Sequence, residues 1–204
     1  MNELNRTIGS YFLERMMPAA TVSKDEIVER LFAVFQEHGF DGASLSDLSR
    51  ATGLGKSSLY HHFPDGKLQM AEAVLDRATA VIDNEIAKVA RSSLPLKARL
   101  RKIVALLNQI YAGGRAHCVL GQLATSTVRL EATAGLRAAF ELWIDAIASL
   151  AEESGMPSQR ARMFAGDWIA RLQGTLIMQA ATGDTGAFER ALDALLELGE
   201  RGGE

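Results

Sequence analysis

A short polar stretch, ATGLGKSSLYHHFPDGK at residues 51–67, gathers side chains whose types and spacing could bind a nucleic acid. Lys56 stands where a short helix would begin, and free backbone N–H groups at a helix start favour a phosphate. Two serines follow it as short donors, and Tyr60 and His61 could reach phosphates or base edges. From Arg50 to Lys67 there are three positive charges against one negative charge. The stretch therefore predicts a local contact with DNA.

Other combinations of reactive side chains are weaker. His61 and His62 are adjacent, so on a helix they would point about 100° apart, and we expect no zinc site there. Cys118 follows His117 and is either a redox-sensing thiolate or a buried small apolar residue, and both readings stay open. No nucleophile elbow, phosphate-binding loop, zinc-protease motif or dinucleotide fingerprint occurs. We expect no enzyme, no metal and no cofactor.

Aromatic residues and methionines in the second half suit a mostly apolar pocket between helices, with a few polar side chains to orient a small molecule. Ordinary core packing is the alternative explanation for each of these residues. The residues expected to bind an effector are Tyr111, His117, Gln122, Phe140, Trp143, Trp168 and Gln173.

The candidate DNA-binding and effector residues lie on predicted helices. A period of 3.6 residues recurs along the chain, and no alternating runs suggest a sheet. We predict an all-α protein of about nine helices, three short ones followed by a long one from Asp65 to about Val89. Residues 46–62 form a helix-turn-helix, in which SDLSRAT and KSSLYHH are joined by GLG. Ser44 or Ser46 opens the first of these two helices.

The segment SLSDLSRATGLGKSSLYHHFPDGK resembles the DNA-binding signature of the TetR family of ligand-responsive transcriptional repressors. Its FPDGK junction is similar to a subgroup that includes repressors of multidrug-resistance genes. Two departures stand out: Gly55 replaces the usual Ser or Thr cap, and the usual basic N-terminal arm is missing. With the resemblance, the residues expected to contact DNA are Ser44, Ser46, Lys56, Ser57, Ser58, Tyr60, His61, His62 and Lys67.

The resemblance implies a DNA-binding domain over residues 1–66 and a helical effector and dimerisation domain over residues 67–204. It also implies a homodimer held by the last two helices. Small residues recur there at i, i+4 and i+8, a pattern that lets helix backbones approach closely, although packing within the subunit is the alternative. The residues expected at the dimer interface are Gly166, Ala170, Gly174, Phe188, Leu192 and Leu195.

Composition sets the remaining limits. The chain has 204 residues with 48% hydrophobic and 23% charged residues, which is an ordinary globular mix. Its longest uncharged stretch has 13 residues, too few to span a bilayer, and its single cysteine suits a reducing compartment. We therefore expect a cytoplasmic protein with no membrane partner.

The expected function is a repressor that leaves a palindromic operator in double-stranded DNA when a small apolar effector binds. The net charge of −3 gives no global signal for nucleic acid. A small-molecule-binding or scaffolding all-α protein with weakened DNA affinity is therefore the alternative.

Overall fold

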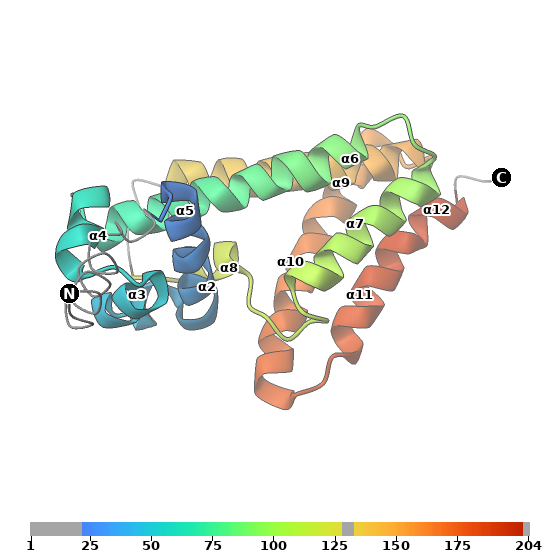
Figure 1. Ribbon diagram of the computed structural model, residues 1–204. Helices are drawn as coiled ribbons and strands as arrows, with labels where there is room; N and C mark the ends of the chain where they lie inside the picture. Colours follow the sequence, from blue (N-terminus) through green and yellow to red (C-terminus); the bar gives the residue numbers. More distant parts are fainter. Residues whose placement is uncertain (1–21, 128–132, 202–204) are drawn as a thin grey trace, which may run out of the picture.

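The protein is helical throughout the part described by a computed structural model, which covers residues 22–127 and 133–201 (Figure 1). No strand occurs in these residues. If the long helix and its two continuations are taken as one rod, these ranges hold nine helices and one further four-residue turn of helix at the end. The prediction of an all-α fold with about nine helices is confirmed.

Three helices form the N-terminal end, and the first of them carries the longest buried face. Helix α2 (Lys24–Gly42) begins at Ser23, whose hydroxyl accepts a hydrogen bond from the Glu26 backbone N–H at 3.2 Å. Ile27, Leu31 and Phe35 recur at helical spacing and are fully buried. At Gly39 the backbone turns to φ 66°, so the last residues of α2 kink away from the regular helix.

Helices α3 (Leu45–Thr52) and α4 (Lys56–His62) make the helix-turn-helix. Ser44 and Asp47 form a reciprocal capping box at the start of α3, which decides between the two candidate caps. Gly53 ends α3 in the left-handed conformation at φ 71°. Leu48 and Leu59 are fully buried, so each helix uses one leucine to hold the pair on the core.

A continuous rod joins the two ends of the molecule. It consists of α5 (Lys67–Val81), a π-helical segment η1 (Ile82–Ala87) and α6 (Lys88–Ala90). The predicted helix from Asp65 to about Val89 has nearly these limits, but the π segment was not foreseen. Residues 81–90, VIDNEIAKVA, contain no proline or glycine that would indicate a break in the α-helix.

The C-terminal region consists of α7 (Leu96–Ile110), α8 (Val119–Ala124), α9 (Thr133–Glu153), α10 (Ser158–Thr182), α11 (Gly186–Leu196) and α12 (Leu198–Arg201). Helix α9 packs along the rod, while α10 and α11 cross them at an angle (Figure 1). Short α8 leaves this region and packs on α2. The buried side chains form one cluster that reaches from Ile27 to Leu198. Among the described helices, none combines the length and apolarity that crossing a membrane requires.

Candidate DNA interface and effector site

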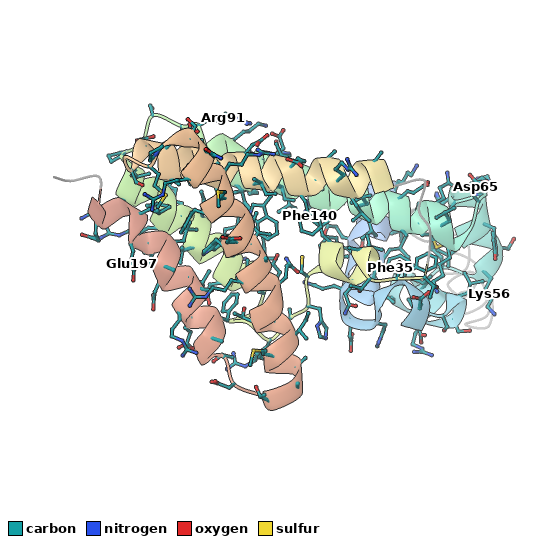
Figure 2. All side chains as sticks on the ribbon, turned by 180° about the vertical axis from the view of Figure 1, so that it is seen from behind. Phe35, Lys56, Asp65, Arg91, Phe140 and Glu197 are labelled. Atoms are coloured by element: carbon teal, nitrogen blue, oxygen red, sulfur yellow. The ribbon has the colours of Figure 1, made fainter. Side chains whose placement is uncertain are left out.

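Helix α4 presents almost all of its side chains to solvent. Lys56, Ser57, Ser58, Tyr60 and His61 are exposed, and within α4 only Leu59 is buried. The exposed fraction of Tyr60 is 44%, a high value for a tyrosine in a folded domain. Lys56 lies at the end of the molecule opposite Arg91 and Glu197 (Figure 2). This helix therefore projects as a polar surface from one end of the protein.

The start of α4 keeps its backbone donors unoccupied by side chains. Gly55 is the N-cap residue and makes no side-chain hydrogen bond to the helix. The first N–H groups of a helix lack intrahelical partners, so they are available to an anion. Gly55, in place of the usual Ser or Thr, thus leaves α4 without a side-chain N-cap, and its lack of a side chain keeps the helix start accessible.

The two serines proposed near the start of α3 differ in their surroundings. The Ser44 hydroxyl accepts from the Asp47 backbone N–H at 3.2 Å and donates to the Asp47 carboxylate at 2.5 Å. Its hydrogen-bonding capacity is used in the cap, so the structure does not support the expected Ser44 contact with DNA. Ser46 lies in the first turn of α3 and is exposed.

Two of the proposed DNA contacts lie partly against the protein itself. His62 is half-buried, with its ring centroid 6.4 Å from that of Phe63. Lys67 places its Nζ 4.4 Å from the centroid of the Phe40 ring, a cation–π contact. Partial burial lowers the pKa of Lys67, and the negative charge of Asp41 opposes that shift. In this conformation Lys67 stabilises the junction of α2 and α5.

Arg50 is an exposed, positively charged residue that was not among the predicted DNA contacts. Its side chain is 78% exposed in the last turn of α3, and its guanidinium lies 3.1 Å from the Asp47 carboxylate. The excess of positive charge from residue 50 to residue 67 was the available signal. Arg50 extends the positive surface from α4 onto α3.

A small internal cavity of about 40 Å³ lies where α2, the rod, α7, α8 and α9 meet, and we call it the inner cavity. Tyr111 and Trp143, two of the predicted effector residues, line it. Within residues 22–127 and 133–201, no acidic or basic side chain lines it. The other lining residues are Phe32, Gln36, Ala78, Val81, Ile82, Ile86, Leu107, Ile110, Cys118, Val119 and Leu120.

Of two polar side chains at the inner cavity, one has a hydrogen-bond partner and the other has none among the described residues. The Tyr111 hydroxyl donates to the Cys118 sulfur at 3.4 Å. Burial raises the pKa of Tyr111 well above its ordinary value, with a further contribution from Cys118, so the phenol stays neutral. Trp143 is 2% exposed, and its Nε1–H has no acceptor among the described residues. An unsatisfied buried donor is costly, so this group calls for an acceptor.

A larger hollow of about 430 Å³, here called the outer cavity, lies between α8, α9 and α10. It brings together four of the predicted effector residues, His117, Gln122, Phe140 and Gln173, from distant parts of the sequence. Phe140 lies in the middle of the molecule, between the two ends (Figure 2). The Gln173 Nε2 is buried without an acceptor, as is the Trp143 indole. Cys118 lines both cavities, so the two hollows share a wall.

Trp168 does not belong to either cavity. It is 3% exposed, and its Nε1–H donates to the Ala191 carbonyl at 2.7 Å, which fastens α10 to α11. Both the ring and the donor are used in the core, so we remove Trp168 from the predicted effector set. Cys118 is 7% exposed, which favours the reading of a buried apolar residue over that of an exposed thiolate.

The cavity walls are tied directly to the DNA-binding end through α2 and the segments that flank α8. Gln36 Nε2 donates to the His117 carbonyl at 2.9 Å. Asp41 accepts from the Thr127 backbone N–H at 2.8 Å and from its hydroxyl, and these bonds lower the pKa of Asp41. None of these contacts was predicted, because each joins residues more than 80 positions apart.

Small residues on α10 leave one face of that helix open. Gly166, Ala170 and Gly174 lie along it, and no atom lies within 4 Å of a Cβ built on either glycine. Met163 and Ile177, at the two ends of the same stripe, are 61% and 68% exposed. Large exposed apolar side chains beside small residues are typical of a surface that another helix covers.

The residues expected on α11 are placed differently from those on α10. Phe188, Leu192 and Leu195 are buried inside the subunit, and the Phe188 ring packs edge-on against Tyr111 at a centroid distance of 6.1 Å. They cannot supply an exposed face to a partner, so this part of the predicted interface is corrected. In the ranges that the structure covers, no three His, Cys, Asp or Glu side chains are grouped to hold a metal ion.

The N-terminal end matches a known family. Residues 27–74 match the model of "Bacterial regulatory proteins, tetR family". The chain is 38% identical over 76 residues to the HTH-type transcriptional repressor AcnR of Corynebacterium efficiens, a match over 35% of this chain and 40% of that protein. It is 39% identical over 44 residues to the negative transcriptional regulator IcaR of the biofilm operon icaADBC of Staphylococcus aureus, over 22% of this chain and 24% of that protein. Both relatives are regulators by name, which agrees with the expectation that this chain is not an enzyme.

Solved structures share the fold over nearly the whole chain. A TetR transcriptional regulator from Legionella pneumophila superposes with a TM-score of 0.77 at 22% identity, over 89% of this chain and 98% of that one. The transcriptional regulator FadR from Bacillus subtilis, solved in complex with stearoyl-CoA, gives a TM-score of 0.62 at 14% identity, over 89% and 100% of the two chains. Residues 27–74 thus match the tetR family of bacterial regulatory proteins, and the chain shares its overall fold with solved TetR regulators.

Proposed function

We propose that the protein is a DNA-binding transcriptional regulator, a repressor that a small apolar effector releases from its operator. The exposed polar surface of α4 carries this proposal. The helix exposes five polar side chains to solvent, and its first backbone N–H groups have no side-chain cap. Within α4 only Leu59 is buried in the core. The names of the relatives AcnR and IcaR support the same role.

The regulator acts as a homodimer in the cytoplasm, with residues 1–66 reading DNA and residues 67–204 binding effector and partner. One recognition helix touches few base pairs, so a palindromic operator with half-sites about 34–36 Å apart needs two copies. The open face of α10 is the proposed meeting surface, since its small residues permit a second helix to approach closely. The apolar side chains of Met163 and Ile177 then become buried in the dimer.

The effector acts on two connections between its site and α4. The rod contributes Ile82 and Ile86 to the inner cavity and continues as α5 into the DNA-binding end. The segment around α8 holds α2 through Gln36 and Asp41. An effector that prefers one placement of these elements changes the separation of the two α4 helices. A coupling of 1–3 kcal/mol would alter operator affinity by about 5- to 150-fold.

A binding titration tests the proposal. Full-length protein is titrated onto fluorescent duplexes from the regions flanking its own gene, with shuffled duplexes of equal length as the control. We expect one flanking duplex to bind at least about 1,000-fold more tightly than the shuffled ones. A Lys56→Ala/Tyr60→Ala double variant should lose that preference. Equal, weak binding to all duplexes by the parent protein would instead support the alternative of an all-α small-molecule-binding protein.

A further inference from the structure

Each of the two cavities is lined by a residue that carries a buried side-chain donor without a partner among the described residues. Within the described residues, the buried polar side-chain atoms without a partner are Trp143 Nε1, Gln173 Nε2 and Arg99 Nε. Trp143 is a lining residue of the inner cavity, and Gln173 is a lining residue of the outer cavity. Indole and amide N–H groups only donate, so the matching ligand group is an acceptor such as a carbonyl or ether oxygen.

The walls also define the charge of the ligand. Among the residues that the structure describes, no Asp, Glu, Lys or Arg lines either cavity, and the Tyr111 phenol is neutral. A cation would find no carboxylate, and a buried ion without a counter-charge loses its hydration without compensation. An uncharged ligand suits these walls best.

The sizes of the cavities suggest how such a molecule lies. The inner cavity of about 40 Å³ has room for a group of a few atoms, whereas the outer one of about 430 Å³ has room for an extended apolar body. Cys118 lines both cavities at the start of α8, so a slender ligand that occupies both must displace this one short side chain. The carbonyl-sized end would then be next to Trp143.

We propose that the effector is an uncharged, slender apolar molecule whose acceptor oxygen receives the Trp143 Nε1–H in the inner cavity while its body lies in the outer cavity. This inference rests on the effector-controlled regulator proposed above and names the chemistry that the effector site selects. Trp143 is thereby the residue that determines specificity for an acceptor. Gln173, with its own orphan donor, is placed to bind a second acceptor if the ligand has one.

Indole proton resonances test this directly, because the chain has two tryptophans and one of them serves as an internal control. Full-length protein labelled with ¹⁵N at the indole nitrogens is titrated with 2-octanone. The Trp143 N–H resonance should move downfield as it gains an acceptor. The Trp168 N–H, already donating to Ala191, should stay in place. A saturated complex in which the Trp143 resonance does not move downfield overturns the proposal.

Charge selection is tested with compounds of matched chain length. The ammonium form of 2-aminooctane and the octanoate anion should each bind at least about tenfold more weakly than 2-octanone. Equal or tighter binding of either ion overturns the proposal that the ligand is uncharged. Trp143→Phe keeps most of the ring volume and removes the donor, so it should weaken 2-octanone binding by about two- to tenfold. Trp168→Phe, which removes a donor outside the cavities, should leave binding within about twofold.

These measurements are made without DNA, which separates the two proposals. Absence of 2-octanone binding would overturn the ligand chemistry while leaving sequence-specific DNA binding intact. Binding of 2-octanone with the expected Trp143 shift, in a protein that does not prefer any flanking duplex, would sustain the ligand chemistry and overturn the regulator.

Discussion

The DNA-binding end and the effector end place their functional residues in opposite environments. On α4 the functional side chains are exposed, and the packing depends on Leu59, a residue with no functional role. In the cavities the functional side chains are themselves core: Trp143 is 2% exposed and Tyr111 is 4% exposed. Stability and recognition are therefore separable at one end of the molecule and joined at the other.

Truncation of one aromatic residue at each end measures the contrast directly. Trp143→Ala should lower the free energy of unfolding by about 3–5 kcal/mol, because it removes a large buried side chain. Tyr60→Ala, the matched truncation on α4, should lower it by about 1 kcal/mol or less. Urea unfolding followed by circular dichroism, at one protein concentration, gives both values. Equal losses for the two variants would show that α4 is not separable from the core.

A charge on the open face of α10 tests a third surface that should behave like α4. Ala170→Arg places a long charged side chain where two copies of the helix are proposed to meet. The dimer dissociation constant should rise by at least about 100-fold, or about 2.7 kcal/mol, with unfolding of the monomer little changed. Sedimentation should then report the 22.1 kDa chain alone at micromolar concentration.

Ala105→Arg is the control for this variant, since Ala105 is an exposed alanine on α7. It should sediment as the parent protein does. Dissociation by both variants, or by neither, would remove α10 as the specific interface.

Removal of one charge from α4 should affect DNA binding alone. Lys56→Ala should reduce the slope of log affinity against log salt by about 1 for each bound subunit, because one phosphate contact is lost. Affinity should fall by about tenfold or more at low salt, on all sequences alike. Lys102→Ala makes the same change of charge at an exposed position on α7 and should leave both quantities unchanged. An unchanged slope for Lys56→Ala would place the phosphate contacts elsewhere.

The smallest effect is expected where the two ends are joined. Gln36→Leu removes the hydrogen bond to the His117 carbonyl and places an apolar side chain of similar size at the cavity wall. The factor by which 2-octanone lowers operator affinity should shrink by about two- to tenfold, which corresponds to one hydrogen bond. Operator binding without ligand should stay close to that of the parent.

An exposed glutamine provides the control for this junction. Gln109→Leu lies on the outside of α7 and should retain the full response to 2-octanone. A full response in Gln36→Leu as well would mean that the rod alone transmits the signal.

The same contrast explains what could be predicted from the sequence. The helix-turn-helix is a contiguous motif, so its helix limits, its glycine turn and its exposed residues follow from neighbours along the chain. At Ser44 the prediction of a DNA contact was weaker, because the same hydroxyl is also a good cap. Four predicted effector residues meet in the outer cavity, since polar side chains on apolar faces were a usable signal there.

Other features depend on tertiary packing that a local pattern does not contain. Trp168 and Trp143 look alike in the sequence, yet one donates to Ala191 and the other has no acceptor. Phe188 has the spacing of an interface residue, but Tyr111 and Gly114 lie against it within the subunit. The bonds from Gln36 and Asp41 across the junction leave no trace in spacing at all.

The π segment Ile82–Ala87 gives the rod a built-in angular offset. A π turn amounts to one extra residue inserted into an α-helix, and each α-helical residue accounts for about 100° of rotation. The DNA-binding and effector halves of this helix are thus out of phase by roughly that angle, compared with an uninterrupted helix. Deletion of the exposed Asn84 would remove the extra residue, return the segment to α-helical winding and keep Ile86 at the cavity that it lines. At this place in the gene, the loss of a single codon would leave the two halves in their present phase, whereas the same loss in the α-helical part of the rod would rotate one half against the other by about 100°.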